Sequence, residues 1–175
     1  MRDFSLVEWS FERKLALALM LSAIDVALSP INIPIGPTRA SPWQHMTNVI
    51  SGVILGPLWA SAIAILVGTV RIILGIGTIF AYPGGIPGGL LVGIGALILR
   101  KAKKKTEYAA FLEPIGTAVI GFLLSLYLVA PIVGKYNAWI SSLVPIWIIW
   151  ILSTGIGTTI GFAAIKILRG AGVLK

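Results

Sequence analysis

Residues 44–74 read QHMTNVISGVILGPLWASAIAILVGTVRIIL, and the way this apolar stretch folds decides the architecture of the chain. A helix needs about 20 apolar residues to cross the hydrocarbon core of a membrane. At 31 residues, the stretch is too long for one upright helix and somewhat short for two. Gly56-Pro57 breaks it near the middle, because proline inside a helix removes a backbone hydrogen bond and clashes with the preceding turn. The stretch can therefore form either one long helix or two short helices.

The distribution of basic residues distinguishes the two folds. With two helices, the chain has six spans, and both termini share a side of the membrane that also carries 11 of the 14 lysines and arginines. Only Arg39, Arg71 and Lys135 lie on or near the other side. With one long helix, the basic cluster at 100–105 would face opposite to the N-terminus. Because basic residues concentrate in cytoplasmic segments, we expect six transmembrane helices with both ends cytoplasmic. Their approximate ranges are 11–29, 44–56, 57–74, 86–100, 111–130 and 143–168.

The composition agrees with an all-α integral membrane protein that forms a single domain over residues 1–175. Hydrophobic residues make up 57% of the chain and charged residues 11%, whereas soluble domains carry about 25% charged residues. Topology accounts for the net charge of +8, and no basic stripe with interleaved aromatic residues indicates nucleic-acid binding. The absence of cysteine excludes disulfides and thiolate metal sites. We expect no cleaved signal peptide, because Asp3, Glu8 and Glu12 are unfavourable before the first apolar run.

The helix expected from residue 44 carries a stripe of polar side chains. Gln44, Asn48 and Ser51 follow the i, i+4, i+7 spacing of one helix face, and His45 lies beside them. Polar groups are costly in lipid, so this stripe should face the interior of the bundle. It either joins helices by hydrogen bonds or forms a ligand site near the outer surface. A metal site is not expected, since one histidine without cysteine or acidic neighbours offers too few ligands.

Two segments on the expected outer side resist helix formation. Residues 29–42 contain four prolines, and residues 75–85 are rich in glycine. Irregular backbone at membrane depth is tolerated only when it is buried in protein or lines a cavity. These segments are therefore either ordinary connectors with interfacial aromatic anchors or walls of a site.

The first helix has two notable features. Asp25 is, with Arg71, one of the two ionisable residues that look most embedded in apolar sequence. The two can form an ion pair, or Arg71 can extend to the outer interface. A second face carries the small residues Ala16, Ala23 and Ala27, which let helix backbones approach closely. This face either packs inside the bundle or docks another subunit.

Motifs for catalysis are missing. The sequence has no G-x-x-x-x-G-K-[ST], HExxH or GxSxG motif and no paired-carboxylate site. We therefore expect no enzymatic activity and no ATP hydrolysis in this chain. A small six-span protein with an outward pocket and no ATPase of its own suggests the substrate-binding subunit of a transporter.

A distinctive string of residues supports this interpretation. It runs PIGP at 34–37, SPWQHMTNV at 41–49, GVILGP at 52–57, then Arg71, then GIGTIFAYPGG at 75–85. Through these residues the sequence resembles the ThiW family, within the substrate-binding (S) components of energy-coupling factor (ECF) transporters, and the likeness covers nearly the whole chain. Trp43 and Tyr82 stand where the family often has phenylalanine.

The resemblance implies a multi-pass protein of a prokaryotic cell membrane that captures a vitamin or vitamin precursor from outside. The implied partners are a transmembrane T component, which the face of Ala16, Ala23 and Ala27 would meet, and two cytoplasmic ABC ATPases. The ligand implied for ThiW proteins is hydroxyethylthiazole, the thiazole precursor of thiamine. No cofactor is expected.

For this small, flat and neutral ligand, aromatic walls and a few hydrogen-bonding groups suffice. We expect Trp43 and Tyr82 to contact the ring, and the polar groups of the stripe to bond its hydroxyl or ring nitrogen; these are Gln44, His45 and Asn48. Thr78 and the glycine-rich segment would close the pocket, with residues 31–42 as a lid. Arg71 is then structural, or it indicates an anionic ligand such as a thiazole phosphate.

Other functions stay open. The chain can be an S component for thiamine itself, its pyrimidine moiety or another vitamin, which a larger pocket would indicate. It can also be a membrane scaffold or sensor whose polar stripe only packs helices. An intramembrane enzyme needs more than His45 and Asn48. A solitary transporter would need matching broken helices in repeated halves, and none is evident.

Overall fold

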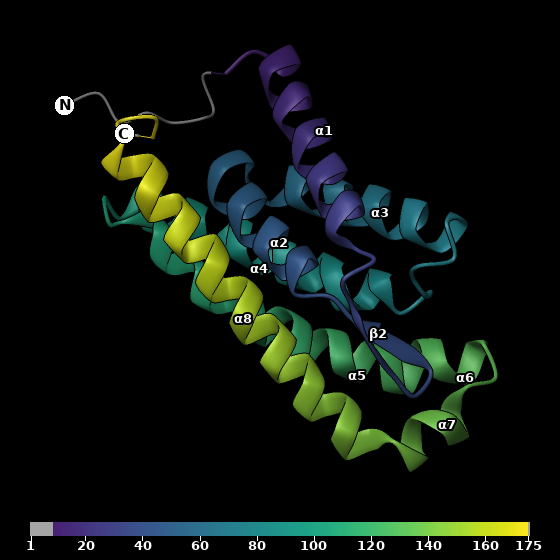
Figure 1. The fold of residues 1–175 in the computed structure, drawn as a ribbon. Helices are drawn as coiled ribbons and strands as arrows, with labels where there is room; N and C mark the ends of the chain where they lie inside the picture. The colour runs from purple at the N-terminus through teal and green to yellow at the C-terminus, as the bar shows by residue number, and fades with distance from the viewer. Residues whose placement is uncertain (1–8, 175) are drawn as a thin grey trace.

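A computed structural model describes residues 9–174, and these residues are mostly helical. Short connections join the elements in chain order (Figure 1): α1 (Phe11–Leu28), β1 (Ile33–Ile35), β2 (Thr38–Ala40), α2 (Pro42–Leu55), α3 (Pro57–Ile73), α4 (Ala81–Lys101), η2 (Thr106–Leu112), η3 (Ile115–Gly121), α5 (Phe122–Leu124), η4 (Ser125–Val129), α6 (Ala130–Ile132), α7 (Tyr136–Ser141) and α8 (Leu143–Gly170). The segments from η2 to α6 follow one another as a continuous helical stretch that begins as a 3-10 turn and contains two π-helical parts, η3 and η4.

The long apolar stretch does form two helices that part at Gly56-Pro57. Gly56 adopts φ +92°, a conformation that other residues rarely reach, and Pro57 starts α3 where its missing N–H costs nothing. The backbone of α4 passes directly over this break. A Cβ built on Gly93 would lie 2.3 Å from the Pro57 nitrogen, so only glycine allows the approach.

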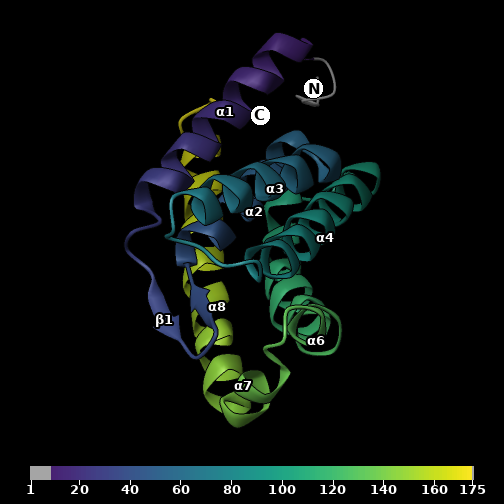
Figure 2. The ribbon, with the colours of Figure 1, turned by 90° about the vertical axis from the view of Figure 1, so that its right-hand side faces the viewer.

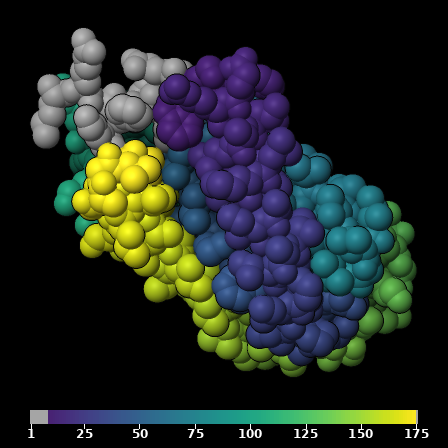
Figure 3. Space-filling model, turned by 45° about the horizontal axis from the view of Figure 1, so that its top comes forward, coloured from purple at the N-terminus to yellow at the C-terminus, as the bar shows by residue number. Residues whose placement is uncertain are grey.

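Helix α2 occupies the centre of the bundle. It packs against α1, α3, α4 and α8, which surround it in both ribbon views (Figures 1 and 2). Glycines on the neighbouring helix surfaces make these contacts close: Gly161 of α8 meets Val49, and Gly52 of α2 meets Val92 of α4. In the space-filling view α1 (purple) lies as a ridge on the outside of the bundle (Figure 3). The polar stripe of α2 therefore lies in the interior of the bundle, as the sequence indicates.

Two elements near the N-terminal end of α2 differ from expectation. Helix α4 begins at Ala81, five residues before the expected start at residue 86. Pro83 is tolerated because it falls in the first turn, and Gly84 and Gly85 serve helix packing instead of a loop: a Cβ on Gly85 would lie 2.0 Å from Gln44 Nε2. The proline-rich segment holds a small antiparallel hairpin, β1–β2, in which Ile33 pairs with Ala40 and Ile35 with Thr38. Gly36, with φ +51°, allows its tight turn.

Three helical segments of the described residues are long and apolar enough to cross a membrane: α4, residues 106–132 and α8. Helix α3 is apolar but shorter, and α1 carries Asp25 and three charges in its first turn. Helix α2 has 14 residues, so it rises about 21 Å where the hydrocarbon core measures about 30 Å. Six crossings therefore remain a prediction.

One end of the bundle gathers the basic residues. The start of α1 and the end of α8 lie at this end (Figures 1 and 2). Arg169 of α8 forms an ion pair with Glu107 at the start of η2 and also donates to Thr106 Oγ1. These contacts bring the basic turn at 100–105 beside the C-terminal end of α8. The cellular side on which this end lies stays a prediction.

Candidate functional site

A hollow lies at the N-terminal end of α2, opposite the basic end of the bundle. It encloses about 260 Å³ of empty space, counting the part that opens to solvent. Five parts of the chain meet there: β2, the start of α2, the start of α4, η3 and the first third of α8. The lining residues are Arg39, Ala40, Ser41, Gln44, His45, Phe80, Ala81, Gly84, Thr117 and Trp150.

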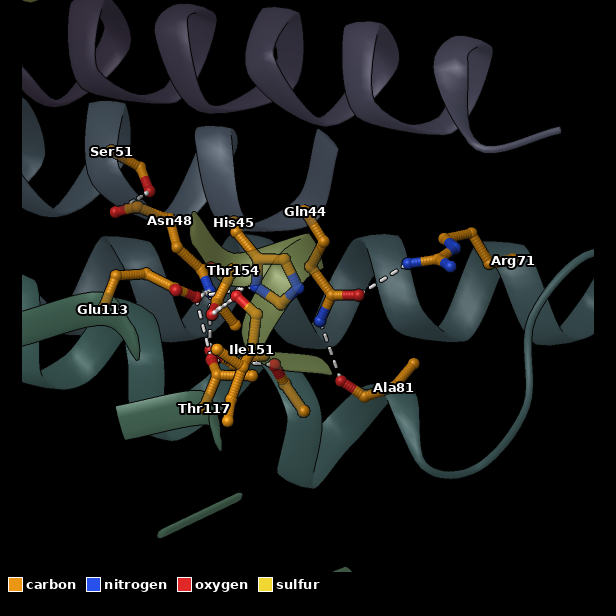
Figure 4. Close-up of polar contacts among 12 residues, drawn as sticks. Gln44, His45, Asn48, Ser51, Arg71, Ala81, Glu113, Thr117, Ile151 and Thr154 are labelled. Carbon is orange, nitrogen blue, oxygen red and sulfur yellow. Dashed lines mark hydrogen bonds and ion pairs between the residues drawn. The ribbon is translucent and has the colours of Figure 1, made fainter. Parts of the chain in front are cut away.

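Gln44 is held in one orientation by two hydrogen bonds (Figure 4). Its Nε2 donates to the Ala81 carbonyl over 2.9 Å, and its Oε1 accepts from Arg71 Nη1 over 2.6 Å. Arg71 is only 1% exposed, and it is absent from the lining. It therefore supports Gln44 from behind and does not reach the hollow itself.

His45 contacts an acidic residue that the sequence analysis did not identify. Its Nδ1 lies 2.7 Å from Oε1 of Glu113, whose side chain is fully buried between η2 and η3. The same oxygen accepts from Asn48 Nδ2 over 3.2 Å and lies 2.8 Å from Thr117 Oγ1. Figure 4 shows the four side chains converging from α2 and from the helical stretch of residues 106–132. The sequence does carry a signal for Glu113, because it is an acidic residue inside the expected helix 111–130.

The other members of the polar stripe have different roles. Asn48 lies one turn below Gln44 and also donates to the Gly85 carbonyl over 3.0 Å, so it joins the wall of the site to α4. Ser51 bonds the Thr47 carbonyl of its own helix over 2.6 Å. The stripe thus divides into Gln44 and His45 at the hollow, Asn48 beneath it, and Ser51 in ordinary packing.

Besides Arg71 and Asn48, three more of the expected site residues lie outside the lining. The Trp43 indole donates to the Ile31 carbonyl over 2.9 Å and holds the segment before the hairpin. The Tyr82 hydroxyl lies 3.0 Å from Thr69 Oγ1 on α3. The Thr78 carbonyl accepts from the Ala81 nitrogen over 2.9 Å at the start of α4. The structure brings Gln44, His45 and Asn48 together, but it does not bring these three to the hollow.

Different aromatic residues line the hollow. Phe80 and Trp150 are 2% and 4% exposed, and both pack against Trp139 with ring centroids 4.9 and 5.7 Å apart. Arg39 of the hairpin lies at the opening and donates from Nη1 to the Gly75 carbonyl over 3.3 Å. This hydrogen bond connects the hairpin to the segment between α3 and α4.

Two polar atoms of the lining residues lack a hydrogen-bond partner among residues 9–174. They are Ser41 Oγ and the Trp150 indole nitrogen, and both are buried. Glu113 Oε2, which lies just behind the lining, is also buried and has no partner among these residues. Because buried polar atoms are normally paired, unpaired atoms at a hollow indicate a place where a polar ligand can bind. The described residues contain no group of three acidic, histidine or cysteine side chains placed to hold a metal ion.

The expected pair of embedded charges does not form a direct contact. Asp25 and Arg71 are each 1% exposed, yet the structure describes no ion pair between them. Arg71 donates to Gln44 instead, and Ser29 Oγ lies 3.5 Å from the Asp25 carboxylate. On the small face of α1, Ala16, Ala23 and Ala27 are all exposed, so packing among residues 9–174 does not use this face.

One comparison with known proteins gives a match. The model of a family described as thiamine-precursor transporter protein (ThiW) matches residues 15–171. No curated protein and no solved structure matches the chain.

Proposed function

Because that match covers nearly the whole chain, the protein belongs to the ThiW family of thiamine-precursor transporters, and we propose that it captures hydroxyethylthiazole as the S component of an ECF importer. The family establishes membrane transport of a thiamine precursor. The thiazole, the ECF mechanism and the partners are our proposal, and the observation that carries it is the hollow between Gln44, His45, Phe80 and Trp150.

The hollow has to widen before any ring can bind. Its volume of about 260 Å³ includes space open to solvent, and its cavity volume is about 20 Å³, which is room for about one water molecule. A five-membered ring with a two-carbon side chain is much smaller than thiamine, which joins that ring to a pyrimidine. The precursor therefore needs a smaller rearrangement of the site than the complete vitamin.

The chemistry of the walls supports a heteroaromatic alcohol. Phe80 and Trp150 supply flat apolar surface for a ring. The unpaired indole N–H of Trp150 can donate to a ring nitrogen, and Ser41 Oγ and the second ring nitrogen of His45 can bond a hydroxyl. Contact of the ring with Trp43 or Tyr82, and closure by Thr78, would require the segments 31–42 and 75–80 to rearrange on binding.

The proposed partners are those that the resemblance to ECF S components implies. The sequence contains no ATP-binding motif, and in such an importer two ATPases would supply the energy for uptake through a T component. The exposed small-residue face of Ala16, Ala23 and Ala27 is our candidate for the T-component contact. Close helix approach in a membrane depends on such small residues.

Calorimetry on the purified full-length protein in detergent tests the ligand. Hydroxyethylthiazole is expected to bind, and thiamine and the pyrimidine moiety are expected to bind much more weakly or not at all. Tighter binding of thiamine would transfer the proposal to an S component for the vitamin. No binding of any of the three would reject the thiazole assignment and favour a scaffold.

Alanine substitutions test the site. Gln44→Ala, His45→Ala and Asn48→Ala are each expected to weaken thiazole binding by roughly tenfold, the effect of about 1–1.5 kcal/mol or one hydrogen bond. His45→Ala would lose a bond to the ligand, whereas Gln44→Ala and Asn48→Ala would lose bonds that hold the wall of the site in place. Ser51→Ala is the matched control, because Ser51 belongs to the same stripe but bonds only its own helix. The fitted Kd should be unchanged for the control, and size-exclusion chromatography should show all four variants monodisperse. Unchanged binding in all three site variants would contradict the proposed site.

A further inference from the structure

Glu113 is the acidic residue behind the lining of the hollow, and its carboxylate has an asymmetric environment. Oε1 is approached by His45 Nδ1 at 2.7 Å, Thr117 Oγ1 at 2.8 Å and Asn48 Nδ2 at 3.2 Å. Oε2 has no hydrogen-bond partner among residues 9–174. A fully buried acidic side chain within an apolar helix is costly unless it has a function or complete pairing.

The contacts of Asn48 show that Oε1 accepts a hydrogen bond. Asn48 Nδ2 lies 3.0 Å from the Gly85 carbonyl, which can only accept, so this atom is the amide nitrogen and the side chain is not flipped. The amide nitrogen can only donate, so Oε1 accepts from it. The oxygens of an ionised carboxylate can only accept. With Glu113 in this form, the ring nitrogen of His45 that faces Oε1 therefore carries the hydrogen.

This arrangement fixes the tautomer of His45. In a neutral imidazole one nitrogen carries a hydrogen and the other a lone pair, and the hydrogen bond of the first decides which is which. With Nδ1–H directed at Glu113, Nε2 presents its lone pair. Figure 4 shows the second ring nitrogen on the side of Gln44, away from Glu113. Both His45 and Gln44 line the hollow, so a ligand there would meet an acceptor.

We propose that Glu113 is a positioning residue that sets the tautomer of His45, and that His45 Nε2 thereby selects ligands with a hydroxyl group that donates to it. The choice of ligand rests on the proposed thiazole function, whereas the tautomer does not. The hydroxyl of hydroxyethylthiazole is its only hydrogen-bond donor. The site would therefore recognise the side chain of the ligand through His45 and leave the ring nitrogen to other groups, such as the Trp150 indole.

The tautomer can be measured without a ligand, because His45 is the only histidine in the chain. Protein with ¹⁵N-labelled imidazole gives one pair of ring nitrogen signals in NMR, recorded at a pH where the ring is neutral. We expect Nδ1 protonated and Nε2 unprotonated in the wild type. Glu113→Ala should shift the ring to the Nε2–H form that free histidine prefers in water. A wild-type protein with Nε2–H would overturn the proposal.

Glu113→Gln separates positioning from charge and guards against a variant that fails to fold. Its amide oxygen can occupy the place of Oε1 and accept from Nδ1, so this variant should keep the wild-type tautomer. Ser51→Ala, which lies on the same helix as His45 but outside the site, should leave both nitrogen signals unchanged. If Glu113→Gln and Glu113→Ala fold and both retain Nδ1–H, Glu113 does not set the tautomer.

The fluoroethyl analogue of the ligand tests the selection. Fluorine is close in size to the hydroxyl group but cannot donate, so wild-type protein should bind the analogue at least about tenfold more weakly than the alcohol. Glu113→Gln should keep this ratio, and Glu113→Ala should reduce it to about twofold or less. Equal wild-type affinities would reject hydroxyl selection. If neither compound binds, the thiazole function fails, and the NMR result alone then decides the role of Glu113.

Discussion

Gly157→Ala is expected to destabilise the protein by about 2–3 kcal/mol, the upper part of the range for forcing an extra methyl group into a closely packed core. A Cβ at this position would lie 2.2 Å from the Pro42 carbonyl oxygen and 2.6 Å from His45 Cβ. The first of these is backbone, which cannot move aside as a flexible side chain would. Helix α8 would have to shift away from α2, and this shift would occur beside His45, which lines the hollow.

Gly155→Ala on the same helix is the matched control. No atom of another element among residues 9–174 lies within 4 Å of a Cβ built there, so the variant should gain up to about 1 kcal/mol from the higher helix propensity of alanine. Unfolding of both variants in the same detergent, by heat or by denaturant, measures the difference. Calorimetry should also show weaker ligand binding for Gly157→Ala alone. Equal stabilities would mean that α2 and α8 do not pack through this glycine.

Arg71→Gln is expected to destabilise the protein by about 3 kcal/mol or more, as removal of a buried compensating charge does. Arg71 is 1% exposed and donates to Gln44 Oε1 over 2.6 Å. Its loss weakens the support of Gln44 and leaves the equally buried Asp25 without the opposite charge on α3. Arg39→Gln is the control, because Arg39 is exposed and surface substitutions usually stay within about 0.5 kcal/mol.

A double-mutant cycle tests whether Asp25 and Arg71 depend on each other. Asp25→Asn alone is expected to destabilise the protein more than the double variant with Arg71→Gln, and the coupling should reach about 1 kcal/mol. The two groups form no direct ion pair in the structure, so the coupling would act through space across the α1–α3 contact. Strictly additive effects would show that each charge is satisfied separately.

Local sequence signals predicted the parts of the fold that depend on neighbouring residues. The break at Gly56-Pro57 follows from the backbone chemistry of the two residues themselves. The inward polar stripe follows from helical spacing and the cost of polar groups in lipid. The same argument identified Gln44 and His45, which line the hollow.

Contacts between distant segments could not be predicted in this way. His45 and Glu113 are 68 positions apart, and nothing in one sequence shows that they meet. Trp43 adjoins Gln44 in sequence, but successive side chains turn about 100° around a helix, so Trp43 faces Ile31 and not the hollow. The glycines at 84–85 suggested a loop because their role, close approach of α4 to Gln44 and Trp150, depends on other helices.

The hydrogen bond from Arg39 to the Gly75 carbonyl bears on how long a ligand stays bound. Arg39 lines the hollow and connects the hairpin to the segment between α3 and α4. Loss of this hydrogen bond would raise the rates of ligand binding and release together. The bond lies at the opening of the hollow and is not part of the aromatic walls that hold the ring of the ligand. Stopped-flow kinetics on Arg39→Gln should therefore show both rate constants rising with little change in Kd. Residence time and affinity would then be set by different parts of the same small protein.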